Sequence, residues 1–464
     1  MTILQQAAFL VTLGTAIFFV RKRALQIMKN IALGTHEAIT GDTSQRWKNV
    51  FLVAFGQKKM FKRPLPAMLH FFVYIGFLVI NLEVLEFIID GLAGTHRIFA
   101  PFLGGFYTVL MNIFEFLAVA VLVSCLILLI RRNIVKVRRF QSTELNGWPR
   151  LDANLILATE VVLMCAILSM NASDQVLQTR PEHADHYVQT GSIFFSAMLV
   201  PAFSGLSDSA LIFIERFAWW FHIIGILGFA VYITYSKHLH IFMAFLNTWY
   251  ARVQPKGKMN NMPVVTREVK SMLGLPVDSV PSGALAEAQA APTGEPGRFG
   301  AKDVNDLSRI HLMAAYSCTE CGRCTSECPA NITGKKLSPR KIMMDVRDRA
   351  EEMGRAQMSR GPGATGGSSE PVGGAVTGAA GKTLLNDYIT KEEINACTSC
   401  NACVEACPVL INPLEIILEL RRYVAMEESG APAQWNSMFQ NVETNFAPWK
   451  FPSADRFNWS RNIQ

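Results

Sequence analysis

Residues 318–329 read Cys318-Thr-Glu-Cys321-Gly-Arg-Cys324-Thr-Ser-Glu-Cys328-Pro329, and residues 397–408 repeat the spacing as Cys397-Thr-Ser-Cys400-Asn-Ala-Cys403-Val-Glu-Ala-Cys407-Pro408. Both runs follow the C-x2-C-x2-C-x3-C-P pattern of bacterial two-cluster ferredoxins. Three thiolates at this spacing can surround one cubane cluster, while the fourth, turned away by the proline, serves the other cluster. We therefore expect two 4Fe–4S clusters with crossed ligand sets: Cys318, Cys321, Cys324 and Cys407 for the first, and Cys397, Cys400, Cys403 and Cys328 for the second.

Zinc is the main alternative metal, because paired C-x2-C units also bind zinc. Four cysteines in each run exceed what zinc needs, so iron is favoured. The flanking sequence is helical rather than like the small β-rich ferredoxins. Ser338 is an expected N-cap with Pro339 at the first helical position, and Pro413 begins a second helix in the same way after the second run.

Apolar residues are concentrated in the first half of the chain. Of 464 residues, 50% are apolar and only 17% are charged. We expect an all-α protein: a five-span transmembrane bundle followed by a soluble helical ferredoxin domain. The predicted parts are a membrane domain (1–250), a linker (251–306) that includes the Ala/Pro/Gly-rich run Pro281–Pro296, the ferredoxin domain (307–430) with a disordered Gly-rich insertion (361–381), and a partner-docking tail (431–464).

Five apolar spans approach the length of about 20 residues that a bilayer requires: Leu4–Val20, Ala67–Ile89, Tyr107–Ile130, Ala153–Met170 and Leu211–Tyr235. The loops 21–66 and 131–152 together hold sixteen Lys and Arg, whereas the loops 91–106 and 171–210 hold two. The positive-inside rule then places the N-terminus outside and everything after the fifth span in the cytoplasm. We expect a multi-pass protein of a bacterial inner membrane, surrounded by lipid. The net charge of +7 lies beside the spans, which argues against nucleic acid as a partner. Gly191–Leu206 is apolar but too short to span, and is predicted to lie at the outer surface.

Histidines near the membrane predict a haem site. His70, near the start of the second span, and His240, after the fifth, lie at the same cytoplasmic level in this topology. Two facing imidazoles are a usual way to hold b-type haem, although an interfacial role for His240 is the simpler alternative. His222 is eighteen residues before His240, which would put both on one face of a continuous helix. A second haem at His222 stays open, because Ile80 and Asn81 occupy the expected place of its partner, and His96, His183 or His186 would serve only if the chain folds back.

Acidic residues also enter the second span. Glu83 and Glu86 share a helix face, and ionisable groups inside a membrane usually face an interior or a cavity. They are candidates for a quinone pocket or a proton path. Interfacial or pore-lining positions are the alternative.

The cysteine region resembles the helical ferredoxin module of heterodisulfide reductase, of the C-subunit and N-terminal D-subunit type. The specific matches are Cys-Gly-Arg-Cys-Thr with Cys-Pro-Ala, and the helix that begins Leu337-Ser-Pro-Arg-Lys. The tail Phe439–Trp459 is similar to the connector that follows this module. The membrane half resembles, more loosely, the nitrate reductase gamma subunit, through Trp220-Phe-His222 and Tyr235-Ser-Lys237-His-Leu-His240.

The resemblance implies b haem and exchange of electrons with a membrane quinone. It implies the pairing of His70 with His240, and a further histidine opposite His222 that this chain lacks. It also implies a partner subunit with Cys-Cys-Gly domains that holds the substrate site, so that this chain would be the electron-transfer subunit of a heterodisulfide reductase-like, quinone-linked oxidoreductase complex. The alternative is a membrane-tethered ferredoxin that wires a complex without haem or quinone chemistry of its own.

Overall fold

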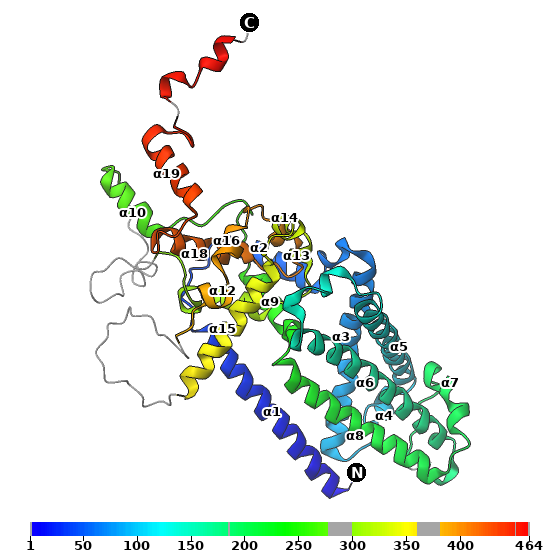
Figure 1. Ribbon diagram of the computed structural model, residues 1–464. Coiled ribbons are helices and arrows are strands. Elements are labelled where there is room, and N and C mark those ends of the chain that lie inside the picture. Colours follow the sequence, from blue (N-terminus) through cyan, green and yellow to red (C-terminus); the bar gives the residue numbers. More distant parts are fainter. Residues whose placement is uncertain (1, 184–185, 277–298, 360–380, 451, 463–464) are drawn as a thin grey trace.

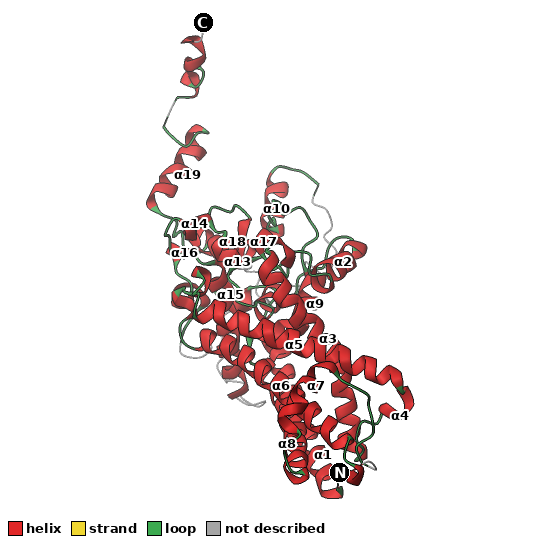
Figure 2. Ribbon diagram, turned by 90° about the vertical axis from the view of Figure 1, so that its right-hand side faces the viewer, coloured by secondary structure: helices red, strands yellow, loops and turns green. Residues whose placement is uncertain are grey.

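The computed structural model describes residues 2–183, 186–276, 299–359, 381–450 and 452–462. The predicted linker run Pro281–Pro296 lies outside these residues, as does the predicted insertion 361–381 apart from Gly381. Within the described residues the chain is built from helices, and no strand is formed (Figure 2). The all-α expectation is confirmed, whereas the exact boundaries of the predicted domains stay predictions.

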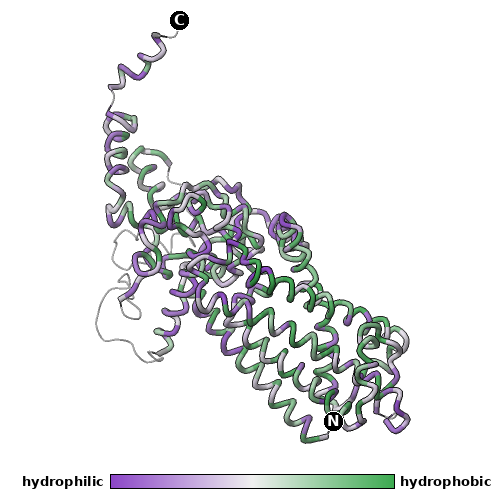
Figure 3. Tube along the Cα trace, turned by 45° about the vertical axis from the view of Figure 1, so that its right-hand side comes forward, coloured by the Kyte–Doolittle hydropathy of each residue, from purple (hydrophilic) through white to green (hydrophobic). Residues whose placement is uncertain are grey.

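Five helices are long and apolar enough to cross a membrane, and they run side by side as an elongated bundle (Figure 1). This confirms the five predicted spans and a multi-pass membrane protein. Figure 3 shows the bundle as mainly hydrophobic and the region at its other end as mixed. The five helices are α1 (Ile3–Ile31), α3 (Pro64–Ala93), α5 (Gly105–Asn133), α6 (Trp148–Gln178) and α8 (Asp208–Ile233).

Helix α6 is at the centre of the bundle, where it packs against both α5 and α8, while α3 packs on α5 and α1 lies against α3 and α8. The bundle core includes Phe9, Phe87, Trp219 and Ile223. Large apolar side chains such as Leu82 remain exposed on the outside, where lipid would cover them. Short helices border the bundle: α2 (Thr43–Asn49), α4 (Ala100–Leu103) and α7 (Phe194–Phe203), the last formed by the apolar segment that is too short to span.

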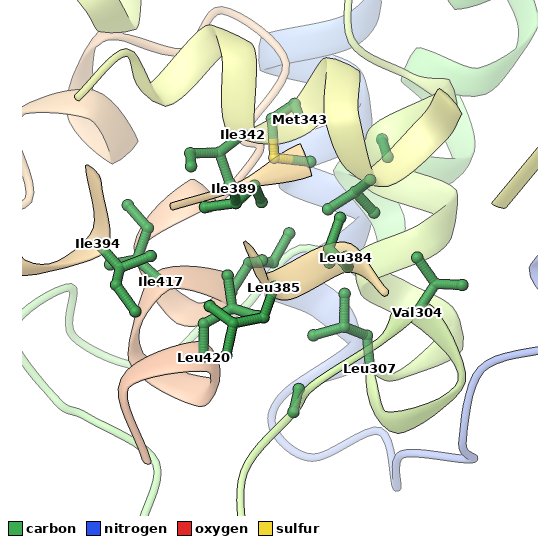
Figure 4. Close-up of a cluster of buried hydrophobic side chains, with 14 of the residues drawn as sticks. Val304, Leu307, Ile342, Met343, Leu384, Leu385, Ile389, Ile394, Ile417 and Leu420 are labelled. Carbon is green, nitrogen blue, oxygen red and sulfur yellow. The ribbon is translucent and has the colours of Figure 1, made fainter. Parts of the chain in front are cut away.

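The cysteine-bearing region is a compact group of helices at one end of the bundle (Figure 1). Its core joins residues far apart in sequence, among them Leu307, Ile342, Leu385 and Ile417, which lie together in Figure 4. The helices are α12 (Arg309–Tyr316), α13 (Arg323–Ser326), α14 (Pro329–Ile332), α15 (Pro339–Ser359), α16 (Lys391–Asn395), α17 (Ala402–Ala406) and α18 (Pro413–Met426).

Capping residues fix where the two long helices of this region begin. The Ser338 hydroxyl accepts a hydrogen bond from the Lys341 amide at 3.4 Å, which confirms Ser338 as the N-cap of α15. Before α18, Asn412 caps in the same manner and accepts from the Glu415 amide. Two further helices, α10 (Pro263–Met272) and α19 (Ala433–Asn445), project from this region, and the chain beyond α19 points away from the rest (Figure 1).

Helix α1 joins the bundle to the cysteine-bearing region. It continues eleven residues past the predicted end of its span, to Ile31, and packs on α15 and α12. Arg23 donates two hydrogen bonds to the Glu351 carboxylate, at 3.0 and 2.7 Å, and both residues are 7% exposed. Tyr316 also donates to Glu351 at 2.6 Å and accepts from Asn30 at 2.8 Å. A buried, fully hydrogen-bonded ion pair of this kind fixes orientation, because either charge alone would be costly to bury.

The chain turns sharply after α8, which corrects one expectation. His222 and His240 do not share one continuous helix: α8 ends at Ile233, and α9 (His240–Tyr250) begins after a separate 3-10 turn. Asp152 holds the corner, since its carboxylate accepts from the Ser236 hydroxyl at 2.7 Å and from the Lys237 amide at 3.3 Å. The eighteen-residue spacing therefore carries no information about the relative direction of the two rings.

Candidate functional site

The two cysteine runs fold into loops of matching backbone conformation. Glu320 and Ser399, the residues before the second cysteine of each run, have φ of 54° and 55°. Gly322 and Asn401, the residues after that cysteine, have φ of 71° and 61° and begin α13 and α17. Glycine and asparagine are the residue types that adopt this left-handed region most readily. The repeated pattern curls each loop so that successive thiols turn toward one space.

The first predicted ligand set lines a single cavity. Its walls include all four expected thiols, of which Cys407 comes from the second run. Arg340 and Met343 of α15 complete one side of this cavity. Helices α13 and α17 pack against each other and thereby bring the two runs together. The crossed arrangement that the spacing predicts is thus the arrangement in which these thiols lie, and a cavity walled by four thiols fits a 4Fe–4S cluster.

The second predicted set gathers on the other side of the same helix pair. Burial raises the pKa of Cys328, and negative charge on Cys397 and Cys400 raises it further, so these thiols lie within electrostatic range. The pKa of Cys403 is raised first by burial and then by charge on Cys397 and Cys328. Neighbouring thiols of this kind ionise together only beside a cation, which the iron of a cluster supplies. Among the described residues, no three His, Cys, Asp or Glu are spaced to hold one metal ion.

The two sites differ in exposure. Cys318, Cys328, Cys403 and Cys407 are buried and Cys321 and Cys324 are half-buried, whereas Cys400 is exposed. The first cavity is also covered from the membrane side. Arg340 donates to the Arg139 carbonyl at 2.8 Å and to Glu144 at 2.7 Å, and both acceptors belong to the loop between α5 and α6. Only the second site therefore presents a thiol to solvent.

His70 and His240 meet, as predicted, from two different helices. Their ring centres are 6.4 Å apart, with an angle of 40° between the ring planes. The Nδ1 atom of His240 lies 3.1 Å from the Lys237 carbonyl oxygen, and a proton on Nδ1 would leave Nε2 free to bind a metal. An iron bound between two imidazole nitrogens would place the ring centres roughly 6 Å apart, so the pair fits axial ligation of haem. His238, for which the sequence predicted no role, lies 5.2 Å from His240.

Arg323 connects the histidine pair with the first cavity. Its side chain donates to the carbonyl of Lys59 at 3.1 Å, in the loop that precedes α3. The guanidinium lies within electrostatic range of His70 on one side and of Cys321 and Cys407 on the other. Sequence reasoning missed this residue, because its position between the two C-x2-C pairs gives no sign that the membrane half would cover it.

His222 is buried in the bundle without a histidine partner. Its Nδ1 atom lies 3.1 Å from the carbonyl oxygen of Leu163. The suggested substitutes have other contacts: His96 stacks on His186 at 5.4 Å, and His183 lies 3.2 Å from Asp208. Within the described part of the chain, no ring contact joins His222 to another histidine. The folded chain thus offers this position no second imidazole.

Glu83 and Glu86 both face the interior of the bundle, and each is 3% exposed. Glu86 accepts from the Tyr107 hydroxyl at 2.8 Å and from the Phe99 amide at 3.0 Å. It belongs to a buried polar network around Arg97, which donates to Asp174 at 2.6 Å. In contrast, Oε1 of Glu83 is buried with no hydrogen-bond partner among the described residues. A buried polar atom without a partner is costly unless a ligand, water or proton serves it.

Comparisons with known proteins agree with this geometry. Residues 317–411, which include all eight clustered cysteines, match the model of the 4Fe-4S dicluster domain. The chain is 27% identical over 97% of its length to the probable iron-sulfur-binding oxidoreductase FadF of Bacillus subtilis, and 27% identical over 90% to the EtfAB:quinone oxidoreductase of Syntrophomonas wolfei. It is 26% identical, over 34% of its length, to the D-type subunit of the dihydromethanophenazine:CoB--CoM heterodisulfide reductase of Methanosarcina mazei.

The matches cover 60% of the first relative, 54% of the second and 35% of the third. No solved structure matches the chain. The fold and the sites define the class: an iron–sulfur electron-transfer protein, anchored by a multi-pass helical bundle, that binds 4Fe–4S clusters in a helical dicluster domain. Within this class, the expected relationship to iron–sulfur subunits of the heterodisulfide reductase type is confirmed.

Proposed function

We propose that this chain carries electrons between a cytoplasmic redox partner and the membrane quinone pool. Its dicluster domain would hold two 4Fe–4S clusters, one on Cys318, Cys321, Cys324 and Cys407 and one on Cys328, Cys397, Cys400 and Cys403. His70 and His240 would hold a b haem. When bound, these groups supply one-electron transfer along the chain, and the protein itself positions, insulates and electrostatically tunes them.

The observation that supports this most is the position of the histidine pair. Two imidazoles from separate helices lie 6.4 Å apart at the end of the bundle that carries the dicluster domain. Arg323 lies between this pair and the first cavity. A packing role would not require either ring to keep a free nitrogen, whereas the hydrogen bond from His240 to the Lys237 carbonyl leaves Nε2 available.

The exposed Cys400 gives the second cluster site the role of partner contact, because electron transfer between proteins needs a cofactor near the surface. We further propose that this partner is a subunit with Cys-Cys-Gly domains, and that the tail 431–464 helps to bind it. The name of the Syntrophomonas relative includes a quinone as acceptor. Glu83, buried without a hydrogen-bond partner among the described residues, is our candidate for the quinone or proton chemistry, with Glu86 beside it. The distribution of Lys and Arg favours an inner-membrane protein with its N-terminus outside and the dicluster domain in the cytoplasm.

Optical spectroscopy on the purified, full-length protein tests the haem. Reduction with dithionite should produce the bands of b-type haem, and either His70→Leu or His240→Leu should abolish them. His183→Leu, at a histidine outside the pair, is the control and should leave the bands unchanged. Iron and acid-labile sulfide without haem bands would reject the haem and leave the alternative, a membrane-tethered ferredoxin. Zinc in place of iron would reject the clusters.

A further inference from the structure

Buried cationic groups without hydrogen-bond acceptors surround the first cluster cavity. Among the described residues, the atoms in this state include Lys59 Nζ, Arg139 Nε and Arg340 Nε. Arg340 lines the cavity itself. Lys59 lies within electrostatic range of Cys407, and Arg139 within range of Cys321. Donors that are buried without an acceptor cost free energy, so their gathering at one place indicates an anionic group that they serve.

Two of these three cations come from the membrane half. Lys59 belongs to the loop before α3, and its carbonyl oxygen accepts from Arg323. Arg139 belongs to the loop after α5, and its carbonyl oxygen accepts from Arg340. The loops are therefore pinned to the dicluster domain through their backbones, which holds the two side chains beside the cavity. A cluster with four thiolate ligands has net negative charge, which is the partner that these donors otherwise lack.

The second cluster site has a different environment. Arg421 is within electrostatic range of Cys397, but it donates its hydrogen bonds to backbone carbonyls, including that of Ile394 at 2.8 Å. Its guanidinium is thus already satisfied by the protein. Cys400 is exposed, so solvent screens charges there more strongly than at the covered first cavity.

We propose that Lys59, Arg139 and Arg340 form a cationic shell that raises the reduction potential of the cluster held by Cys318, Cys321, Cys324 and Cys407 above that of the other cluster. Reduction adds one negative charge to a cluster, and buried cations stabilise that charge. At equilibrium the first electron added to the domain therefore resides beside the membrane and the histidine pair. This inference depends on the proposed function, since it requires both clusters.

A redox titration of the full-length protein in detergent, with dithionite as reductant and low-temperature EPR as readout, tests the shell. The wild type should show two separate reduction steps. Lys59→Met should lower the upper step by at least about 59 mV, which is a tenfold change in the ratio of reduced to oxidised cluster for one electron. Lys58→Met, at the exposed neighbour, should move neither step, and Lys59→Arg should keep most of the wild-type potential.

The two steps are assigned with Cys400→Ser, which should alter the EPR signal of the lower step alone. If Lys59→Met does not retain iron, Arg139→Met carries the same expectation. One shared potential in the wild type, or a downward shift of the lower step in Lys59→Met, would overturn the shell while leaving the proposed function intact. Absence of any iron–sulfur signal from the wild type would instead reject the proposed function.

Discussion

The buried ion pair between Arg23 and Glu351 provides the sharpest test of how the dicluster domain is fixed to the membrane bundle. In Glu351→Gln the shape of the side chain is kept, but the guanidinium of Arg23, 7% exposed, loses its counter-charge. Removing one partner of such a pair costs about 3–5 kcal/mol. Because the glutamine oxygen still accepts one hydrogen bond, we expect the lower end of this range, about 3 kcal/mol.

This cost should appear as easier separation of α15 from α1. A change of about 3 kcal/mol corresponds to roughly a hundredfold faster amide hydrogen exchange in α15, if exchange occurs through that opening. The matched control is Arg355→Gln, since the Arg355 side chain also faces Glu351, at 3.9 Å, but is 72% exposed. An exposed pair contributes about 0–1 kcal/mol, so exchange should hardly change. Equal exchange in the two variants would refute the assignment of the docking energy to the buried pair.

The same pair predicts a pH dependence. Burial acts to raise the pKa of Glu351, but hydrogen bonds from Arg23 and Tyr316 outweigh it, so the pKa lies below its ordinary value. A carboxyl with a depressed folded-state pKa stabilises the folded state fully above its unfolded value, about 4.3, and the stabilisation is lost as pH falls through the folded value. Protection of α15, corrected for intrinsic exchange, should be constant from about pH 6 to 8 and fall in acid. A transition near neutral pH would contradict this.

Three further substitutions test single features. Gly354→Ala should destabilise the contact of α1 with α15 by about 1–3 kcal/mol, because the added Cβ would lie 1.8 Å from the Asn30 side-chain oxygen; thermal loss of cluster absorbance measures it, and an unchanged midpoint would count against this packing. Asp303→Asn leaves the fully buried Arg349 without its ionic partner at 2.7 Å and should cost about 3 kcal/mol or more in the same assay, so a cost below about 1 kcal/mol would show the pair to be dispensable. Asp152→Asn should loosen the corner after α8 and shift the haem bands without removing the clusters; bands identical to wild type would mean that this corner does not position the haem.

Local sequence patterns predicted the elements well where a single physical requirement determines them. A bilayer demands about 20 apolar residues, so five spans were visible, but helix ends are set by contacts outside the membrane. Nothing local shows that α1 continues to Ile31, because its last turns are stabilised by Glu351 and Tyr316, more than 280 residues away. The cysteine spacing contains the geometry of its own loops, and this is why the crossed arrangement could be predicted.

The histidines show both the reach and the limit of this reasoning. His70 and His240 could be paired from topology alone, because only their level in the membrane mattered. The relation of His222 to His240 required a continuous helix, and a buried carboxylate on another helix, Asp152, ends that continuity. Lys59 and Arg323 escaped notice for the same reason: their significance lies in neighbours that only the tertiary fold supplies.

The cover that the loop between α5 and α6 places over the first cysteine cavity has a consequence for biogenesis. The Arg139 carbonyl and the Glu144 carboxylate close this side through Arg340, a residue 1% exposed. Iron and sulfide delivered by an assembly protein would have to enter before this contact forms. Maturation of the chain would then have a fixed order, in which the metal centres are built first and the membrane segment seals them afterwards.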